Sequence, residues 1–252
     1  MELINISDSK FYIYTHGKTD LIGKTINKYK CWEPYITKII YDILLNTSGA
    51  FVDIGANIGY YSLLIASLNR KVYAFEPSHL NYTLFKKSII KNNLSKYIKL
   101  YTFGLGDTNK QIYLHYNSSN YGATKITNRK TKLISEIKQY SEIPVLKNKK
   151  VALVKIDVEG YEYEVLIGME NSFRYIDNFI IEFSPKLKKG NYYLNIYTLL
   201  VNYGYICFDI GGKMSGYYNQ YSSTPKKIGL NYVKSFLKSS KQTNLLFKKK
   251  YN

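Results

Sequence analysis

The stretch Phe51-Val-Asp53-Ile-Gly55-Ala-Asn57-Ile-Gly59 joins an apolar strand to a glycine-bearing turn and then to a helix. Gly55 lets the backbone turn tightly where the strand ends, and Asn57 is among the few residue types that tolerate a left-handed conformation. Gly59 allows a close approach to the helix that follows, and the free amides at the helix start favour a carboxylate or phosphate. The junction therefore predicts a nucleotide-type pocket.

The spacing of the small residues narrows the choice of ligand. A dinucleotide fingerprint that begins at Gly55 needs glycines at positions 57 and 60, where this chain has Asn57 and Tyr60. An acidic residue followed by glycine-type positions at every second place is instead typical of the S-adenosylmethionine (SAM) pocket of methyltransferases. The alternative is a glycine turn that binds no ligand.

Glu76 closes the next apolar run, Lys71 to Phe75, and stands before Pro77. It follows the glycine turn by about twenty residues, the distance at which a second strand end brings a carboxylate to ribose hydroxyls. An acid at this place is also common as a charge that favours a helix start. Because Glu76 is paired with the first motif at this spacing, we expect it to bind a ribose.

The chain has 252 residues, enough for one well-buried α/β domain with a short extension. We expect a lead-in over residues 1–32 and a single domain over residues 33–252. No apolar run reaches 18 residues, no signal peptide is visible, and Cys31 and Cys207 are the only cysteines. These features predict an intracellular, soluble, cytoplasmic protein without a membrane span or a disulfide framework.

The formal net charge of +18 allows an anionic partner such as RNA. Nearly all of the positive charge is lysine, however, whereas bidentate phosphate recognition favours arginine. Lys, Asn, Ile and Tyr are all encoded by A/T-rich codons, so genome composition accounts for part of the charge. No acidic residue follows Asp209, and this lysine-rich end is either a solvated surface or a patch that attracts an anion.

Strand-like and helix-like segments alternate after a first amphipathic helix at 34–46, which predicts parallel strands joined by right-handed crossovers. The expected strands are 51–54, 71–75, 98–103, 151–156, 178–182, 205–210 and 244–247, and the expected helices are 59–68, 79–92, 161–168 and 192–202. Residues 1–30 look irregular or short-stranded. The apolar face of the helix at 34–46 is expected to pack on the sheet, and Trp32 and Glu33 at its entrance are possible ligand contacts. Residues 111–116 are a candidate additional strand, and 117–150 and 211–242 are expected to shape a substrate site.

A second acidic cluster, Lys155-Ile-Asp157-Val-Glu159-Gly160-Tyr-Glu162, follows the strand expected at 151–156. Asp157 and Glu159 are two residues apart just past the strand end, so both are expected to face one cleft. Glu162 falls on the following helix and is expected to be solvated near the helix N-terminus. The structural alternative is that Asp157 caps that helix.

Taken together, the motifs resemble the FkbM family of SAM-dependent methyltransferases. The resemblance runs from about residue 33 to 248 and rests on Asp53 to Gly59, Phe75-Glu76-Pro77, Gly104-Leu105-Gly106-Asp107, Lys155 to Glu162, Ile180-Ile-Glu182 and Asn244 to Phe247. It implies an α/β class I methyltransferase fold, Rossmann-like, with a seven-stranded, mostly parallel sheet, helices on both faces and an antiparallel last strand. It also implies methyl transfer to a hydroxyl of a sugar, glycan or related small molecule.

The resemblance also assigns residues to the cofactor. Asp53, Gly55, Ala56, Asn57 and Gly59 would surround the methionine part of SAM, Glu76 would hold the ribose, and Leu105, Gly106 and Asp107 would lie near adenine.

The acceptor must be held in line with the methyl carbon and must lose a proton. We expect Asp157 or Glu159 to act as the base or to orient the hydroxyl, with Glu182 in support. Alternatively, Mg²⁺ is bound by Asp157, Glu159 and Glu182. His79 is a rival base, although a histidine at a helix start is more often a surface residue; His16 and His115 have no recognisable partner in the sequence.

Two other functions stay open. The first is an RNA ribose 2′-O-methyltransferase that uses Lys155, Asp157, Glu182 and Lys186, with a lysine of near-neutral pKa as the base. The second is a SAM-binding scaffold that has lost turnover.

Overall fold

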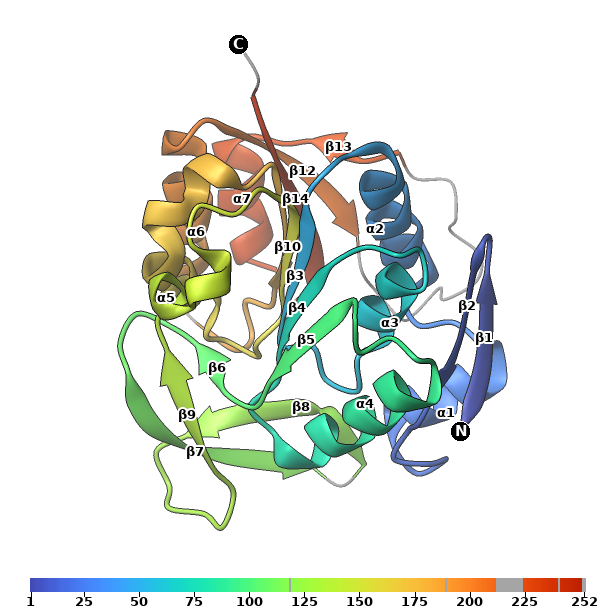
Figure 1. Ribbon diagram of the computed structural model, residues 1–252. Helices are drawn as coiled ribbons and strands as arrows, with labels where there is room; N and C mark the ends of the chain where they lie inside the picture. Colours follow the sequence, from blue (N-terminus) through green and yellow to red (C-terminus); the bar gives the residue numbers. More distant parts are fainter. Residues whose placement is uncertain (118, 189, 212–223, 240, 251–252) are drawn as a thin grey trace.

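The buried apolar runs of the chain pair into one central sheet in the computed structural model, with the strand order β13-β12-β14-β11-β10-β3-β4-β5 (Figure 1). The structure describes residues 1–117, 119–188, 190–211, 224–239 and 241–250. The strands of this sheet are β3 (Ala50–Ile54), β4 (Val72–Phe75), β5 (Ile98–Tyr101), β10 (Val151–Ile156), β11 (Asn178–Phe183), β12 (Tyr205–Gly211), β13 (Lys226–Lys227) and β14 (Thr243–Lys249).

The predicted fold class is confirmed. Strands β5, β4, β3, β10 and β11 are parallel neighbours, and β14 runs antiparallel between β11 and β12. The sheet has eight strands rather than the expected seven, because β13 adds an antiparallel pair to β12 at the edge. Its two exposed lysines carry no strand pattern, so only the neighbouring strand reveals this element.

Helices cover both faces of the sheet because its central strands are apolar on both sides. In β11, Phe179 and Ile181 pack in the core beneath α5, α6 and α7, while Ile180 packs in the core on the other face, beneath α2, α3 and α4. The helices are α1 (Leu21–Tyr29), α2 (Pro34–Asn46), α3 (Tyr60–Ala66), α4 (His79–Lys91), α5 (Glu162–Met169), α6 (Tyr192–Asn202) and α7 (Leu230–Leu237). Of these, α1 and α7 were not expected.

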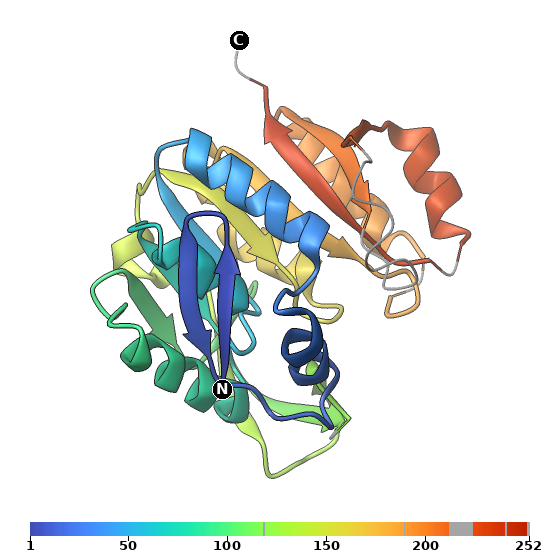
Figure 2. The same ribbon diagram turned by 90° about the vertical axis from the view of Figure 1, so that its right-hand side faces the viewer.

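The N-terminal residues are more regular than predicted. Strands β1 (Glu2–Ile6) and β2 (Ser9–Ile13) form a two-stranded antiparallel sheet that lies beside α3 and α4 (Figure 2). Ile4 and Phe11 are buried in the same core as α2 and α3. The Ser9 hydroxyl also donates to the backbone oxygen of Leu64 in α3 at 3.1 Å. The lead-in is therefore packed into the core that lies beneath α2 and α3.

The segment after β5 forms a second sheet in the order β6-β9-β7-β8, where only one strand was expected. Its strands are β6 (Gly104–Leu105), β7 (Lys110–Asn117), β8 (Asn120–Thr127) and β9 (Ile134–Lys138). The buried carboxylate of Asp20 joins β8 to α1, because one oxygen accepts from the Gly23 amide at 2.8 Å and the other from the Tyr121 amide at 2.9 Å. We call α1 and β8 together the roof.

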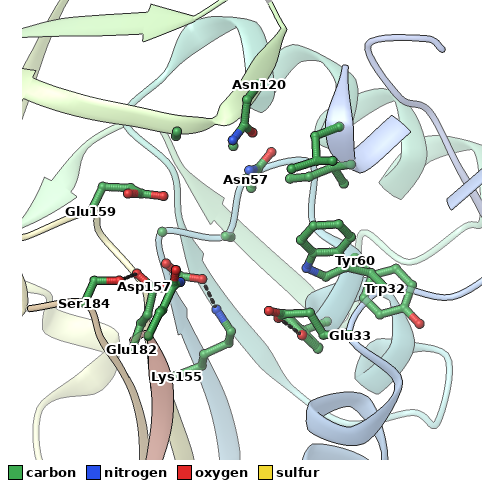
Figure 3. Close-up of a pocket in the computed structure, with 18 of the residues that line it drawn as sticks. Trp32, Glu33, Asn57, Tyr60, Asn120, Lys155, Asp157, Glu159, Glu182 and Ser184 are labelled. Atoms are coloured by element: carbon green, nitrogen blue, oxygen red, sulfur yellow. Dashed lines mark hydrogen bonds and ion pairs between the residues drawn. The ribbon is translucent and has the colours of Figure 1, made fainter. Parts of the chain in front are cut away.

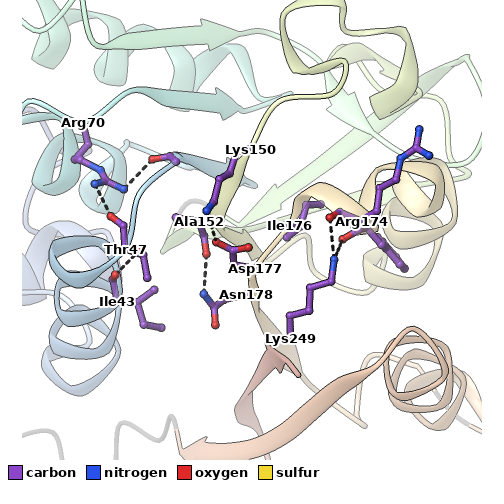
Figure 4. Close-up of polar contacts among 12 residues, drawn as sticks. Ile43, Thr47, Arg70, Lys150, Ala152, Arg174, Ile176, Asp177, Asn178 and Lys249 are labelled. Carbon is purple, nitrogen blue, oxygen red and sulfur yellow. Dashed lines mark hydrogen bonds and ion pairs between the residues drawn. The ribbon is translucent and has the colours of Figure 1, made fainter. Parts of the chain in front are cut away.

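Polar contacts close the amino end of the central sheet (Figure 4). Arg70 donates to the backbone oxygens of Thr47 and Gly49 at 2.7 and 2.8 Å, just before β3 begins. Lys150 pairs with Asp177 at 3.8 Å in front of β10 and β11. The carboxyl ends of the strands thus form the open edge, under the roof. In the described part of the chain, no helix is long and apolar enough to cross a membrane.

Candidate functional site

A cavity of about 420 Å³ lies at the carboxyl edge of the sheet, and we call it the main cavity. Its walls come from the turn after β3, the entrance of α2, the roof, and the ends of β10 and β11 (Figure 3). A smaller cavity of about 50 Å³ adjoins it near Glu76. This position fits the rule that open α/β sheets bind ligands beyond the carboxyl ends of their strands.

The glycine turn has the backbone that its sequence predicts. Gly55, Asn57 and Gly59 have φ values of 80°, 54° and 85°. A Cβ atom on Gly55 would come within 1.9 Å of the Asp157 backbone oxygen, and one on Gly59 within 2.1 Å of the Phe85 ring. The turn therefore needs glycine at both positions, for backbone conformation and for close packing.

Asp53 stands directly below this turn and is almost fully buried. Its Oδ2 accepts from the Ser62 hydroxyl at 2.7 Å, while its Oδ1 is buried and has no hydrogen-bond partner among the described residues. Ala56 lines the main cavity, and its amide donates to the Phe75 oxygen at the end of β4. An unsatisfied buried carboxylate oxygen is costly, so it is the kind of atom that a ligand donor would satisfy.

Glu76 follows β4 and is held in one orientation by three donors. Its carboxylate accepts from the Asn57 amide at 2.8 Å, the Ser78 amide at 2.9 Å and the Asn81 side chain at 3.3 Å. Burial raises the pKa of Glu76 to about 7, although these hydrogen bonds favour the ionised form. The predicted ribose-binding residue therefore lies next to the glycine turn.

His16 has a hydrogen-bond partner, Asn81, which the sequence did not reveal because the two residues lie far apart in the chain. Its Nε2 is 2.7 Å from Oδ1 of Asn81, whose amide group donates to Glu76. The His16 ring stacks on Tyr121 of β8 with a centroid distance of 4.0 Å. The N-terminal segment and the roof thus support the orientation of Glu76. By contrast, His79 and His115 are exposed.

The smaller cavity has apolar walls. Leu105, Ile112, Leu114, Ile126 and Ile137 line it, together with the ring of Tyr161. Among the residues expected near adenine, only Leu105 lines this cavity. Gly106 lies where a Cβ would meet Tyr161 and Ile137 at 2.8 Å or less, and Asp107 accepts from the Tyr161 hydroxyl at 3.3 Å.

Asp157, Glu159 and Glu182 come together at the floor of the main cavity. One carboxylate oxygen from each lies within 4.8 Å of the others. Burial, and then the charge of Asp157, raises the pKa of Glu159 to about 8, and burial raises the pKa of Glu182 well above its usual range. Glu182 also accepts from Gln242 and from Ser184. The predicted catalytic residues therefore share one site.

Lys155 is the buried counterion of this floor. Its Nζ lies 2.8 Å from Oδ2 of Asp157. Burial alone would lower the pKa of Lys155, but the charges of Asp157, Asp53 and Glu33 more than offset this and raise it. Lys155 therefore stays charged at neutral pH and forms an ion pair with Asp157.

The entrance of α2 supplies the wall opposite Asp157. Glu33 lies across Lys155 from Asp157, with Trp32 and Tyr60 beside it (Figure 3). The Tyr61 hydroxyl donates to Oε2 of Glu33 at 2.6 Å. Trp32 and Glu33, expected from the sequence as possible ligand contacts at a helix entrance, both line the main cavity. Their place in the cavity depends on how α2 packs against the sheet.

The segments expected to shape a substrate site contribute in part. Asn120, Gly122 and Ala123 of the roof line the main cavity, as do Lys241 and Gln242 near β14. Residues 212–223 and 240, which belong to the second expected segment, lie outside the described residues.

Glu162 is fully buried, so the expectation that it is solvated was wrong. Its Oε1 accepts from the Gly160 amide at 2.9 Å, and its Oε2 has no partner among the described residues. Burial raises the pKa of Glu162 to about 7. Helical periodicity placed it on α5 but did not show that this first turn faces the core.

We expect the stability of the protein to fall as the pH rises from 5 to 8. The folded state binds the Glu162 proton with a pKa of about 7, against 4.5 for the free side chain. The stability that protonation contributes is therefore lost between pH 4.5 and 7. At about 1.4 kcal/mol per pKa unit, this group accounts for up to roughly 3 kcal/mol.

Thermal unfolding of Glu162→Gln across this pH range measures the effect, and the variant should lose the part of the pH dependence that Glu162 contributes, while the raised pKa values of Glu76 and Glu159 keep the remainder. Glu136→Gln is the control because that side chain is exposed and pairs only with Lys138. An equal pH dependence in Glu162→Gln and the wild type would contradict the expectation.

Comparisons with known proteins add an independent finding. The sequence model of a family described as the methyltransferase FkbM domain matches residues 53–207. "Methyltransferase 1" of Beauveria bassiana (strain ARSEF 2860) is 29% identical over 237 residues, which cover 81% of this chain and 89% of that protein. "Methyltransferase sdnD" of Sordaria araneosa is 26% identical over 218 residues, with coverage of 72% and 81%.

Among solved structures, methyltransferase FkbM from Methylobacillus flagellatus KT superposes with a TM-score of 0.51 at 16% sequence identity. The match covers 79% of this chain but only 43% of the Methylobacillus protein. At this identity the likeness concerns the fold.

Proposed function

The chain belongs to the FkbM methyltransferase family, and from this premise we propose that it is a SAM-dependent O-methyltransferase that acts on a hydroxyl of a sugar, glycan or related small molecule. The observation that carries the proposal is the arrangement at the carboxyl edge of the sheet. A fixed carboxylate, Glu76, adjoins the glycine turn on one side of the cavity, and an acidic floor lies on the other.

The residues present fit SAM. The buried Oδ1 of Asp53, which lacks a partner among the described residues, calls for a donor such as the ammonium group of the methionine part. Gly55, Ala56 and Asn57 line the main cavity where this part would bind, and Gly59 lies behind the turn against the Phe85 ring. Glu76 has the acceptor oxygens for ribose hydroxyls, and Leu105 lines the cavity proposed for adenine, whereas Gly106 and Asp107 do not line it. When bound, SAM supplies the activated methyl group.

The chain's own residues then position the acceptor and remove its proton. Asp157 or Glu159 accepts the proton of the acceptor hydroxyl, and Glu182 supports their orientation. A general base of this kind contributes about 10² to 10⁴ in rate, and positioning contributes several kcal/mol. Lys155 pairs with Asp157 at 2.8 Å and fixes the position of its carboxylate in the cavity.

The same three carboxylates also fit Mg²⁺, since each offers a hard oxygen ligand within 4.8 Å of the others. Asp157, Glu159 and Glu182 would hold the ion, and its charge would lower the pKa of the acceptor hydroxyl. Loss of activity with EDTA and recovery with Mg²⁺ would support this version.

RNA ribose methylation is the second candidate, supported by the net charge of +18 and by Lys186 and Lys241 at the cavity. That chemistry uses a lysine of near-neutral pKa as its base. The carboxylates around Lys155 raise its pKa instead, so the acidic residues are the better bases. A SAM-binding scaffold without turnover is the third candidate, and the intact Asp157 cluster argues against it.

The function is tested by calorimetric titration with SAM, followed by transfer of a labelled methyl group to sugars, glycans and capped RNA in one preparation. We expect SAM binding and label in a sugar or glycan fraction. Label in capped RNA, with binding that weakens steeply with salt, would favour the second candidate. SAM binding without transfer would favour the scaffold, and absence of SAM binding would refute the proposal.

A further inference from the structure

Glu33 has an unusual backbone for its position. It is the N-cap residue of α2, yet its φ and ψ are 39° and 68°, in the left-handed region, whereas N-cap residues are normally extended. Its side chain makes no capping hydrogen bond to α2. The residue therefore does not serve the usual purpose of a polar N-cap, and left-handed backbone is unfavourable for a glutamate.

The carboxylate of Glu33 is held beside the acidic floor. The Tyr61 hydroxyl donates to its Oε2 at 2.6 Å, and the Tyr61 ring centroid lies 5.1 Å from Nζ of Lys155. That Nζ is already paired with Asp157 at 2.8 Å. Glu33 and Asp157 thus flank one buried lysine and face the main cavity from opposite walls (Figure 3).

The neighbours of Glu33 are aromatic. Trp32 and Tyr60 line the same wall of the main cavity, and Trp32 is the only tryptophan of the chain. An aromatic face packs well against the apolar face of a ring, while a carboxylate accepts hydrogen bonds from the hydroxyls at its edge. The residues proposed for the cofactor lie on the other side, at the glycine turn and Glu76.

We propose that Glu33 is an acceptor-binding residue, whose carboxylate accepts a hydrogen bond from a hydroxyl of an uncharged, ring-shaped acceptor that packs against Trp32. The left-handed backbone at the entrance of α2 directs the carboxylate into the cavity. The buried Nζ of Lys155 is already paired with Asp157 and flanked by Glu33, so it is not available to a phosphate at this end of the acceptor. This inference rests on the proposed function and specifies the second substrate of the same site.

Trp32 provides the test, because its emission reports directly on this wall. Protein saturated with S-adenosylhomocysteine is titrated with methyl glycosides of neutral hexoses and, for comparison, with a hexose phosphate. We expect the emission to respond to a neutral glycoside and not to the phosphate. Glu33→Gln should raise the Kd of that glycoside by about 10- to 100-fold, the loss of a hydrogen bond to a charged group. Its affinity for S-adenosylhomocysteine should not change.

Asp42→Asn is the matched control, because Asp42 is an exposed carboxylate on the same helix that pairs with Lys38. It should bind both ligands as the wild type does. Glu33→Gly separates binding from stability, since glycine adopts this backbone without strain. We expect it to lose glycoside binding and to melt no lower than the wild type.

Each other outcome has a definite meaning. If no glycoside alters the emission of Trp32, or if Glu33→Gln binds the glycoside normally, the assignment of Glu33 is overturned. A lower melting temperature for Glu33→Gly would show a structural role instead. Weaker binding of S-adenosylhomocysteine to Glu33→Gln would move this wall to the cofactor. If the wild type itself does not bind S-adenosylhomocysteine, the proposed function fails first.

Discussion

Glu76→Ala is expected to weaken SAM binding by about 10² to 10⁴, through the loss of hydrogen bonds from two ribose hydroxyls to a charged acceptor, at about 1.5–3 kcal/mol each. The orientation of this carboxylate is already fixed by the amides of Asn57 and Ser78 and by Asn81. No reorganisation is then needed on binding, which makes the interaction strong. Calorimetric titration measures the change.

Glu76→Gln is also expected to bind poorly, because one side-chain oxygen cannot accept from all of these donors and still bind ribose. The control variant Glu136→Gln changes an exposed ion pair on β9 and should bind SAM normally. In the wild type, affinity should fall below pH 7 as Glu76 gains a proton. Full SAM affinity in folded Glu76→Ala would overturn the assignment of the ribose site.

Asp157→Asn is expected to lower the rate of methyl transfer by about 10² to 10⁴, the usual contribution of a general base. SAM binding should be largely retained, because the cofactor residues proposed here lie at the glycine turn and at Glu76. The amide keeps the shape of the side chain but cannot take the proton of the acceptor. Single-turnover measurement with saturating SAM separates this effect from binding.

Asp177→Asn is the matched control for Asp157→Asn. Asp177 also pairs with a lysine, Lys150, but at the amino end of the sheet, away from the cavity. The Asp177→Asn variant should transfer the methyl group at the wild-type rate. If Asp157→Asn and EDTA treatment both left turnover unchanged, neither the base nor the Mg²⁺ version of the mechanism would hold.

The central sheet could be predicted from the sequence because its strands are buried on both faces and read as short apolar runs. Phe51 to Ile54 and Val151 to Ile156 are fully buried strands, each followed directly by a polar motif. Parallel strands bring such motifs to one edge, so Glu76 and the Asp157 cluster were expected to meet near the glycine turn. In the structure, Glu76 and the Asp157 cluster do lie together beside the glycine turn.

The parts that escaped prediction depend on contacts between distant segments. Glu33 was a possible ligand contact, but its position beside Tyr61 and Lys155 depends on how α2 packs on the sheet. His16 meets Asn81 only when the N-terminal segment folds back. In the second sheet, β8 is half-exposed along its length with little alternation, so its sequence carries no clear strand pattern. Glu162 was misplaced because charge suggested solvent, whereas the first turn of α5 faces the core.

The two hydrogen bonds that Asp20 accepts bear on how the main cavity forms during folding. One carboxylate joins the amide of Gly23 to that of Tyr121, two residues that stand about a hundred positions apart in the chain. Closing so long a loop is entropically unfavourable, and contacts of this range form late in folding. The pairing of β3 with β10 in the central sheet closes a loop of similar length, so we expect the roof and the centre of the sheet both to form late in folding. Because Glu182 and Gln242 also line the main cavity, the cavity is complete only when the chain has been synthesised beyond Gln242, and cofactor uptake becomes one of the last steps of maturation.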